Sequence, residues 1–204
     1  VSDVDAAALK RASRFPGAHA VEACSEADAL AHCILITTRD DRIGPVCEEI
    51  CRNGGIRPGD ICCHMSGAGG LDLLAPARRF GAQVASIHPI QSFADVDGAV
   101  ANLPGSTFGV TADPSFLDWA CQLVRDLGGV PLVVAESEKT LYHAAACVAS
   151  NYLTTLLSMV EDLYRSLGVD AQSARQAFWP LVLGTLRNIE VRGPVEALTG
   201  PIAR

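Results

Sequence analysis

The sequence predicts an α/β fold with a mostly parallel sheet, followed by an all-α domain. In the first two thirds of the 204 residues, short continuous apolar runs alternate with amphipathic helical segments. This alternation is typical of strands joined by helices in a parallel sheet. After residue 135 the strand signals stop and helical patterns remain. We therefore expect an α/β domain over residues 1–135 and a helical domain over residues 136–204.

The predicted strands are short apolar runs that turn residues separate from the predicted helices. Five runs have this form: Cys33–Thr38, Ile61–Met65, Gln83–His88, Ser106–Thr111 and Val130–Ala135. Helices are predicted over Ala6–Ser13, Asp41–Cys51, Gly70–Phe80 and Asp113–Leu127. An aspartate before a proline, as at Asp113, is typical of a helix start, and paired glycines after residues 53 and 127 favour helix ends.

Helical patterns fill the rest of the chain. One runs over Glu138–Leu167, a second over Asp170–Arg192, and a third begins at Val195 and is interrupted at Gly200 and Pro201. The apolar stretch Leu141–Val160 is about long enough to span a bilayer. It contains polar side chains, however, and two acidic residues follow it directly, so we expect a helix buried in protein and no membrane partner. Two aromatic residues of these patterns, Tyr142 and Trp179, are predicted to lie in the core.

The composition is that of a globular protein, with 49% hydrophobic and 19% charged residues. A net charge of −7 argues against a nucleic-acid partner, because phosphate binding needs clustered Lys and Arg. The eight cysteines mostly lie in apolar runs and the sequence shows no secretory signal, so we expect reduced thiols in a cytoplasmic protein. Cys47 and Cys51 have helical spacing, and adjacent Cys62 and Cys63 would point to opposite faces of a strand. This spacing predicts no metal site.

Polar or glycine-rich segments form the carboxyl ends of the first three predicted strands. They are Thr37–Asp40, Ser66–Gly69 and His88–Ser92. Parallel strands present their carboxyl ends at one edge of the sheet, and ligands of such sheets bind there. The sequence therefore predicts a ligand cleft at this edge.

Several motifs, in the same order along nearly the whole chain, resemble a bacterial family of Rossmann-like NADP oxidoreductases with an uncharacterised helical C-terminal domain. The family lies in the 6-phosphogluconate dehydrogenase-like superfamily. The segments that carry the resemblance are His64–Ala68, His88–Phe93, Lys139–Ala146, Ala149–Leu153 and Leu198–Ile202. The resemblance implies a Rossmann domain, NADP or NAD as cofactor, a small-molecule substrate and a homodimer formed through the helical domain.

Proteins of this kind open with a strand and a G-x-G-x-x-G loop, whose helix N-terminus holds the pyrophosphate. In this sequence only the tail of the second strand of that pattern is found, at Val1–Asp3. We therefore expect a sheet that is incomplete at its N-terminus. The glycine-rich unit is missing either from the native protein or from this sequence alone.

The rim segments supply candidate cofactor contacts. Hydroxyls after the first strand could reach the ribose, and Arg39 could pair with a phosphate or simply with Asp40. Backbone N–H groups of the glycine-rich turn after the second strand could face an anion, although such a turn could equally be structural. The candidate cofactor residues are Thr37, Thr38, Arg39, Ser66, Gly67 and Ala68.

Candidate catalytic residues lie on the long helix and at the end of the third strand. Lys139 and His143 are four residues apart and share one helix face, with Asn151 two turns further on. By resemblance, Lys139 or His143 is the general acid–base and Asn151 donates a hydrogen bond to the substrate. Apolar packing would lower the pKa of the lysine. His88 could orient a substrate carbonyl or carboxylate. The alternative is a surface lysine with structural histidine and asparagine.

Two functions remain open from the sequence. The first is an NAD(P)-dependent oxidoreductase that transfers hydride between nicotinamide and a small carbonyl, imine or hydroxy compound. The second is a non-catalytic dimeric protein that keeps the fold as a ligand-binding or interaction module. The substrate and the direction of reaction do not follow from the sequence.

Overall fold

The computed structural model describes residues 1–21 and 31–198 of the chain. It divides into two compact units, Val1–Ala146 and Cys147–Arg204. The first unit holds the sheet and the second is helical, so each is considered by itself. Our predicted boundary between the functional domains, after residue 135, stays a prediction.

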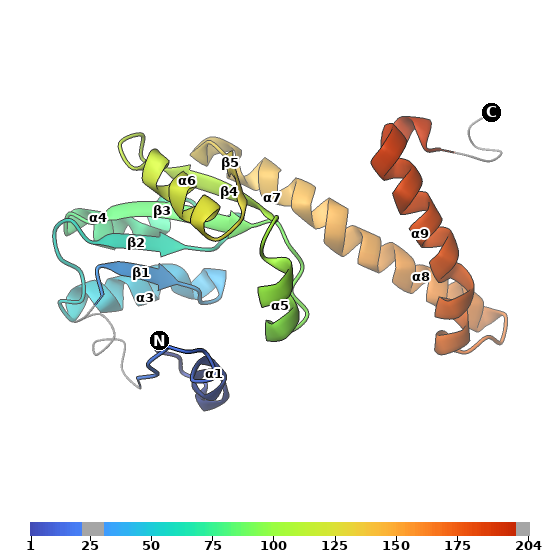
Figure 1. The fold of residues 1–204 in the computed structure, drawn as a ribbon, viewed down its shortest axis with the longest axis horizontal. Coiled ribbons are helices and arrows are strands. Elements are labelled where there is room, and N and C mark those ends of the chain that lie inside the picture. The colour runs from blue at the N-terminus through green and yellow to red at the C-terminus, as the bar shows by residue number, and fades with distance from the viewer. Residues whose placement is uncertain (22–30, 199–204) are drawn as a thin grey trace. The chain divides into compact units, whose positions relative to one another are not determined.

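The first unit is built on a five-stranded sheet with the order β1-β2-β3-β4-β5 (Figure 1). The strands are β1 (Cys33–Ile36), β2 (Ile61–His64), β3 (Gln83–Pro89), β4 (Thr107–Ala112) and β5 (Val130–Val133). All five predicted strands are confirmed, with ends shifted by two residues at most. The chain order of the strands equals their order in the sheet, which fits short connections between neighbours.

The sheet is mostly parallel, with one reversal. β1 with β2, β2 with β3 and β4 with β5 are parallel pairs, whereas β3 and β4 are antiparallel. The carboxyl ends of β1, β2 and β3 therefore share one edge, which is called the rim below. The predicted cleft used the ends of these three strands, so the reversal leaves that prediction intact.

Alternating side chains of the strands feed two apolar cores on opposite faces. On β2, Cys62 belongs to a core with residues of α3 (Asp40–Arg52) and α4 (Ala75–Arg79). Its neighbour Cys63 belongs to a second core with residues of α6 (Leu117–Asp126). The predicted opposite orientation of the two cysteines is thus confirmed, as the two-residue period of a strand requires.

The helices of the first unit follow the predicted pattern with two differences. Short helix α5 (Val96–Asn102) was not predicted; the side chain of Asp95 caps it by accepting from Gly98 N at 2.7 Å. The predicted start of α6 at Asp113 is wrong, because the Asp113 carboxylate pairs with Arg78 at 2.9 Å instead. The remaining bounds are α1 (Ala6–Ala12), a 3₁₀ turn (Leu71–Leu74) before α4, a 3₁₀ turn (Glu136–Glu138) and α7 (Lys139–Cys147).

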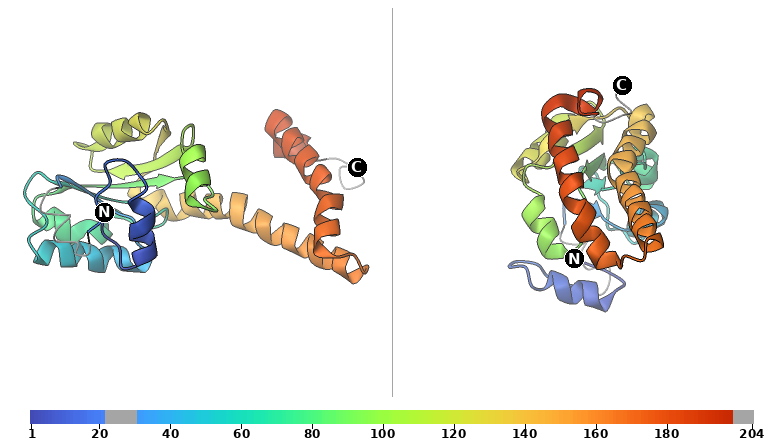
Figure 2. Two further views of the ribbon diagram at one scale, coloured as in Figure 1. Left: turned by 60° about the horizontal axis from the view of Figure 1, so that its bottom comes forward. Right: turned by 90° about the vertical axis from the view of Figure 1, so that its right-hand side faces the viewer.

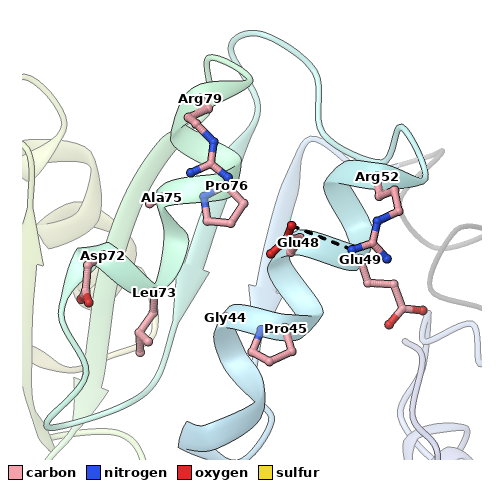
Figure 3. Close-up of a pocket in the computed structure, with 10 residues that line it drawn as sticks. All are labelled: Gly44, Pro45, Glu48, Glu49, Arg52, Asp72, Leu73, Ala75, Pro76 and Arg79. Carbon is pink, nitrogen blue, oxygen red and sulfur yellow. Dashed lines mark ion pairs between the residues drawn. The ribbon is translucent and has the colours of Figure 1, made fainter.

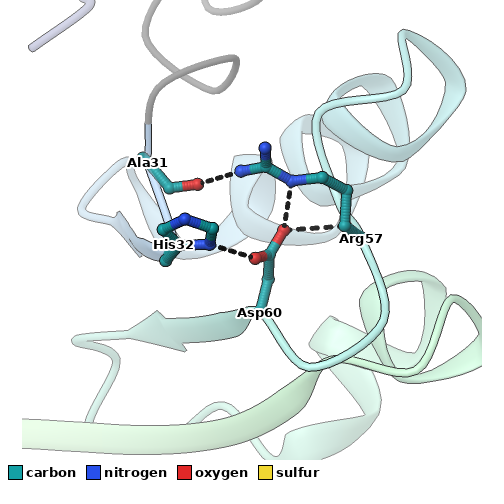
Figure 4. A network of polar contacts seen from close by, with 4 residues as sticks. All are labelled: Ala31, His32, Arg57 and Asp60. Carbon is teal, nitrogen blue, oxygen red and sulfur yellow. Dashed lines mark hydrogen bonds and ion pairs between the residues drawn. The ribbon is translucent and has the colours of Figure 1, made fainter.

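A buried carboxylate ties the start of β2 to the segment before β1 (Figure 4). Asp60 is 2% exposed and accepts hydrogen bonds from Arg57 N at 2.8 Å, Arg57 Nε at 3.1 Å and His32 Nδ1 at 3.0 Å. Arg57 also donates to Ala31 O at 2.6 Å. Burial acts to raise the pKa of Asp60, but these hydrogen bonds outweigh it and lower that pKa. The ionised carboxylate therefore holds the entries of two neighbouring strands together.

Six of the described cysteines are free thiols, namely Cys33, Cys47, Cys51, Cys62, Cys63 and Cys121, and all of them except Cys33 are buried. Cys24 lies outside the described residues. Within the described ranges, no group of three or more His, Cys, Asp and Glu side chains is placed to bind a metal ion. The buried thiols act as small apolar side chains of the two cores.

The second unit consists of helices. A π-helical turn (Val148–Tyr152) leads into α8 (Leu153–Ser166), and α9 (Ala171–Glu196) follows. The predicted cap is confirmed, because the Asp170 carboxylate accepts from the backbone N–H groups of the next turn. The helix pair meets near its connecting turn and diverges away from it (Figure 2). The predicted break at residues 200 and 201 lies outside the described residues.

The helices of the second unit expose much apolar surface. Among its described residues, three are buried: Ala174, Phe178 and Ala197. Trp179, predicted to be core, is 47% exposed. The described helices include none that combines the length and the apolar character needed to cross a bilayer.

Candidate functional site

The rim is held together by Ser66, which follows β2. The Ser66 hydroxyl donates to Asp40 Oδ2 at 2.7 Å and accepts from Gly69 N at 2.8 Å. Asp40 is the first residue of α3, four residues after the last residue of β1. Ser66 therefore links the loops that follow two neighbouring strands. This use of its hydroxyl was not predicted from the sequence.

His64, the last residue of β2, supports the loop that follows this strand. It is fully buried, its Nδ1 accepts from Ser66 N at 3.1 Å, and its Nε2 lies 3.0 Å from Gly70 O. Because Nδ1 accepts, the ring proton is on Nε2, which donates to the carbonyl. Burial lowers the pKa of His64 and keeps the ring neutral. The sequence signal that could have identified His64 is a histidine at a strand end before a glycine-rich turn.

Lys139, at the start of α7, reaches the same place. Its side chain is 2% exposed, and Nζ donates to Ser86 Oγ at 2.7 Å and to Ser66 O at 3.2 Å. Ser86 in turn donates to Ser66 O at 3.1 Å. Burial lowers the pKa of Lys139 to about 8, and nearby Glu136 and Asp40 act against this shift. The predicted lowering of this pKa is confirmed. The alternative, in which Lys139 is a surface lysine, is wrong.

His88 and Tyr142 form a second contact between β3 and α7. The Tyr142 hydroxyl lies 2.8 Å from His88 Nδ1, and the rings meet edge to face with centroids 5.6 Å apart. Burial, together with nearby His143 and Lys139, lowers the pKa of His88 to about 4. Burial raises the pKa of Tyr142. At neutral pH both groups are therefore uncharged hydrogen-bonding partners. Tyr142, predicted to be core, is a half-buried polar contact.

The face of β3 explains why these groups meet. Val84, Ser86 and His88 alternate onto one face, on which Val84 packs into the core with α3 and α4. Ser86 then contacts Lys139, and His88 contacts Tyr142. The strand face thus changes from apolar to polar toward the rim. Ser86 was missed, although the period of two that contains His88 could have found it.

Two glycines let the side chains come this close. A Cβ atom on Gly67 would lie 2.9 Å from Cε1 and Nε2 of His88 and would overlap Nδ1 of His143. A Cβ atom on Gly109 of β4 would overlap the hydroxyl of Tyr142. His143, also half-buried, contacts His88 edge to face at a centroid distance of 5.6 Å. The structure therefore brings Lys139, His143 and His88 together, as the prediction of a shared site requires.

The other predicted site residues lie around or apart from this cluster. Thr37, Thr38 and Arg39 are exposed at the rim, and Arg39 pairs with Asp41 at 3.2 Å. In the loop after β2, Ala68 is exposed and Gly67 is buried. Asn151 belongs to the second unit and is exposed in its π-helical turn. The catalytic and cofactor roles of all these residues stay predictions.

A groove of about 600 Å³ in the first unit lies elsewhere (Figure 3). It runs between α3 and the segment Asp72–Arg79 and shares no residue with the cluster. Gly44 of α3 and Ala75 of the other segment are among the residues that line it, and Glu48 and Arg52, which also line it, form an ion pair at 3.9 Å.

The sheet, its flanking helices and the polar rim define a Rossmann-like protein with an added helical part. Family models agree: residues 1–89 match the Rossmann-like domain, and residues 106–204 match a domain of unknown function, DUF2520. The first part of the chain is therefore similar to Rossmann-like domains and the second part to DUF2520 domains. The resemblance recognised in the sequence motifs is confirmed. No curated protein matches the chain.

Solved structures share the fold. A Thermotoga maritima protein, TM1727, is 23% identical with a TM-score of 0.71, and the match covers 98% of this chain and 74% of that one. A candidate NADP oxidoreductase from Bacteroides fragilis is 15% identical with a TM-score of 0.78 and the same coverages. A pyrroline-5-carboxylate reductase from Coxiella burnetii is 15% identical with a TM-score of 0.64, covering 95% of this chain and 70% of that one.

Proposed function

We propose that the chain acts in an NAD(P)-dependent oxidoreductase that transfers hydride between nicotinamide and a small carbonyl, imine or hydroxy compound. One observation carries the proposal: uncharged His88 and Tyr142 and a lysine of lowered pKa gather at the rim of a Rossmann-like sheet. Perturbed titratable groups at a ligand-binding edge are typical of active sites. The oxidoreductase names of two fold relatives support the same class.

The proposed chemistry requires a proton to accompany the hydride. When hydride adds to a carbonyl carbon, the bonding electron pair moves to oxygen, which then takes a proton. Lys139 or His143 is proposed to supply it, and His88 to orient the substrate oxygen. A lysine pKa of about 8 favours proton exchange near neutral pH. Asn151 is proposed as a further donor to the substrate.

The cofactor proposed for this site is NADP or NAD, which supplies the hydride when bound. The rim fits such a group, because the hydroxyls of Thr37 and Thr38 and the guanidinium of Arg39 are exposed there. Ser66, Gly67 and Ala68 complete the proposed set. Ser66 supports it indirectly, since its polar groups are engaged by Asp40, His64 and Lys139.

Calorimetric titration of the chain with NADPH and NADH tests this proposal. We expect binding of at least one cofactor, and a loss of about fivefold or more in affinity for Arg39→Ala, which removes a charged phosphate contact. Arg125→Ala, an exposed arginine of α6, is the matched control and should bind as the parent chain does. If neither cofactor binds, the oxidoreductase proposal fails and the non-catalytic ligand-binding module is favoured.

We also propose that the chain forms a homodimer through its helical part and is a cytoplasmic protein. Support for the dimer comes from apolar side chains of α8 and of the residue that caps its end, which repeat at intervals of three and four residues. Leu156, Met159, Leu163 and Leu167 are 58%, 57%, 68% and 78% exposed. Such spacing places them on one helix face, and contiguous apolar surface of this kind marks an interface.

A further inference from the structure

We infer that Tyr142 is a positioning residue for His88. Its hydroxyl donates to His88 Nδ1 and thereby fixes the imidazole with its single proton on Nε2, beside Gly67. The inference rests on the proposed function in one respect, because it makes His88 Nε2–H the hydrogen-bond donor to the substrate. No role for Tyr142 was expected from the sequence beyond a place in the core.

The contact distances favour this direction of donation. The Tyr142 oxygen lies 2.8 Å from His88 Nδ1 and 3.3 Å from the backbone oxygen of His88. A hydroxyl has one proton to donate, and the shorter contact lies at the preferred distance for a hydrogen bond. We assign that proton to the shorter contact, which makes Nδ1 the acceptor. With the proton directed to the His88 carbonyl instead, Nδ1 would carry its own proton and donate to the hydroxyl, and NMR would show the Nδ1–H tautomer.

The protonation state of His88 makes the tautomer decisive. Burial, nearby His143 and Lys139 keep the ring uncharged at neutral pH, although Asp40 acts in the opposite direction. An uncharged imidazole carries one proton, on either Nδ1 or Nε2. When Nδ1 accepts from the tyrosine, the proton is on Nε2.

The sheet sets the position of both partners. β3 and β4 pair His88 directly with Gly109, on which the hydroxyl end of Tyr142 lies. A side chain at position 109 would displace that hydroxyl, so the glycine forms its seat. The nearly perpendicular rings, at 88°, keep the phenol aimed at the edge of the imidazole.

The opposite edge of the ring lies against the rim. A Cβ atom on Gly67 would approach Cε1 and Nε2 of His88 to 2.9 Å, so Nε2 borders the loop that follows β2. An N–H group here fits an acceptor atom, such as the oxygen of a carbonyl compound or of the alkoxide formed when hydride adds to it. The contact of Tyr142 with His88 thus gives the site a hydrogen-bond donor, Nε2–H, that carries no charge.

Nitrogen-15 NMR of the histidine-labelled chain at neutral pH tests the inference without cofactor or substrate. His88 should show the Nε2–H tautomer, as should His64, whose Nδ1 accepts from Ser66 N and which serves as an internal reference. In Tyr142→Phe, His88 should change to a mixture of both tautomers while His64 stays unchanged. The exposed tyrosine at position 152 provides the matched control, Tyr152→Phe, which should leave both histidines as they were.

A second variant keeps the Tyr142 hydroxyl but fills the space that Gly109 leaves for it. Gly109→Ala should displace Tyr142 and produce the same mixture at His88. An Nδ1–H tautomer in the parent chain would overturn the inference, even if no variant folds, and so would an unchanged His88 in Tyr142→Phe. Because the spectra need no cofactor, a chain that fails to bind NADPH and NADH can still show the tautomer, so the two proposals fail separately.

Discussion

Gly67 shows how one missing side chain shapes the site. Its Cα borders the imidazoles of His88 and His143, and there is no room for a methyl group between them. The conformation of Gly67 is one that other residues can adopt, since its φ is not positive. Space, and not backbone freedom, therefore requires a glycine here.

The first prediction concerns this residue. Gly67→Ala should destabilise the chain by about 1–3 kcal/mol, because overpacking forces neighbouring side chains out of place. Gly184→Ala should have the opposite sign, a gain of about 0.5–1 kcal/mol, because the residue lies within α9 and a Cβ there meets no atom within 4 Å. Denaturant unfolding measures both. A stabilised Gly67→Ala chain would contradict the packing described for the two histidines.

Lys139 supplies a second prediction at the same scale. Its pKa is about 8 in the folded chain and 10.5 ordinarily, so between these values the unfolded chain binds more protons. Stability from this group therefore rises with pH over that window, by up to about 1.4 kcal/mol per pH unit. Unfolding free energies at several pH values should show this rise in the parent chain and not in Lys139→Met. Parallel curves for the two chains would show that the amine is not buried as described.

The residues that sequence patterns could identify are those with unusual chemistry in an apolar context. Lys139 and His143 stood out on an apolar helix, and His88 stood out at a strand end. Tyr142 and Ser86 did not, because tyrosine and serine are common in such segments and their role depends on a partner far away in the chain. Contacts such as Tyr142 to His88, 54 residues apart, are set by the sheet register.

At the scale of elements, local patterns predicted the strands well. Each strand has apolar residues bounded by turn signals, and the positive φ of Gly54 and Gly128 confirms two of the predicted helix ends. The reversal between β3 and β4 could not be predicted, because strand direction depends on how the connection crosses the sheet. α5 was missed because its seven residues, Val96–Asn102, carry a weak apolar pattern.

Asp60 provides the prediction for the elements. Asp60→Asn should cost about 1–3 kcal/mol, because hydrogen bonds from Arg57 and His32 to a buried carboxylate weaken. The folded pKa lies below the unfolded value of about 3.8. The contribution is therefore present above that value and is lost as pH falls through the folded pKa.

Denaturant unfolding at about pH 6 and about pH 3 measures this difference. Asp126→Asn, an exposed carboxylate at the end of α6, is the control and should change stability by less than about 0.5 kcal/mol. A difference between Asp60→Asn and the parent chain that stays constant down to the lower pH would contradict the described network.

For the whole molecule, the two units differ in how much they bury. The sheet unit has two apolar cores, whereas few described side chains of the helical unit are buried. This contrast follows from the sequence only in part, because helical periodicity shows an apolar face without showing what covers it. The family resemblance implied that a second copy of the chain covers this face.

The last prediction tests whether a second copy of the chain covers this apolar face. Light scattering coupled to size exclusion should give twice the mass of one chain for the parent protein. Leu163→Glu should reduce the measured mass to that of one chain, because burying a charge in an apolar interface is unfavourable. Leu127→Glu, at an exposed apolar residue of the sheet unit, should remain dimeric. A parent chain that stays monomeric at high concentration would refute the dimer.

β1 has a consequence for handling the protein. It stands at the end of the strand order, and the side chain of Leu35 is 47% exposed. Peptide groups along such an outer strand are templates onto which another extended segment can add. β5 stands at the other end of the order, and its Val130, Leu132 and Val133 are 55%, 46% and 56% exposed. In concentrated solution we therefore expect aggregation to start from either outer strand, and a lysine in place of Leu35 protects only the first.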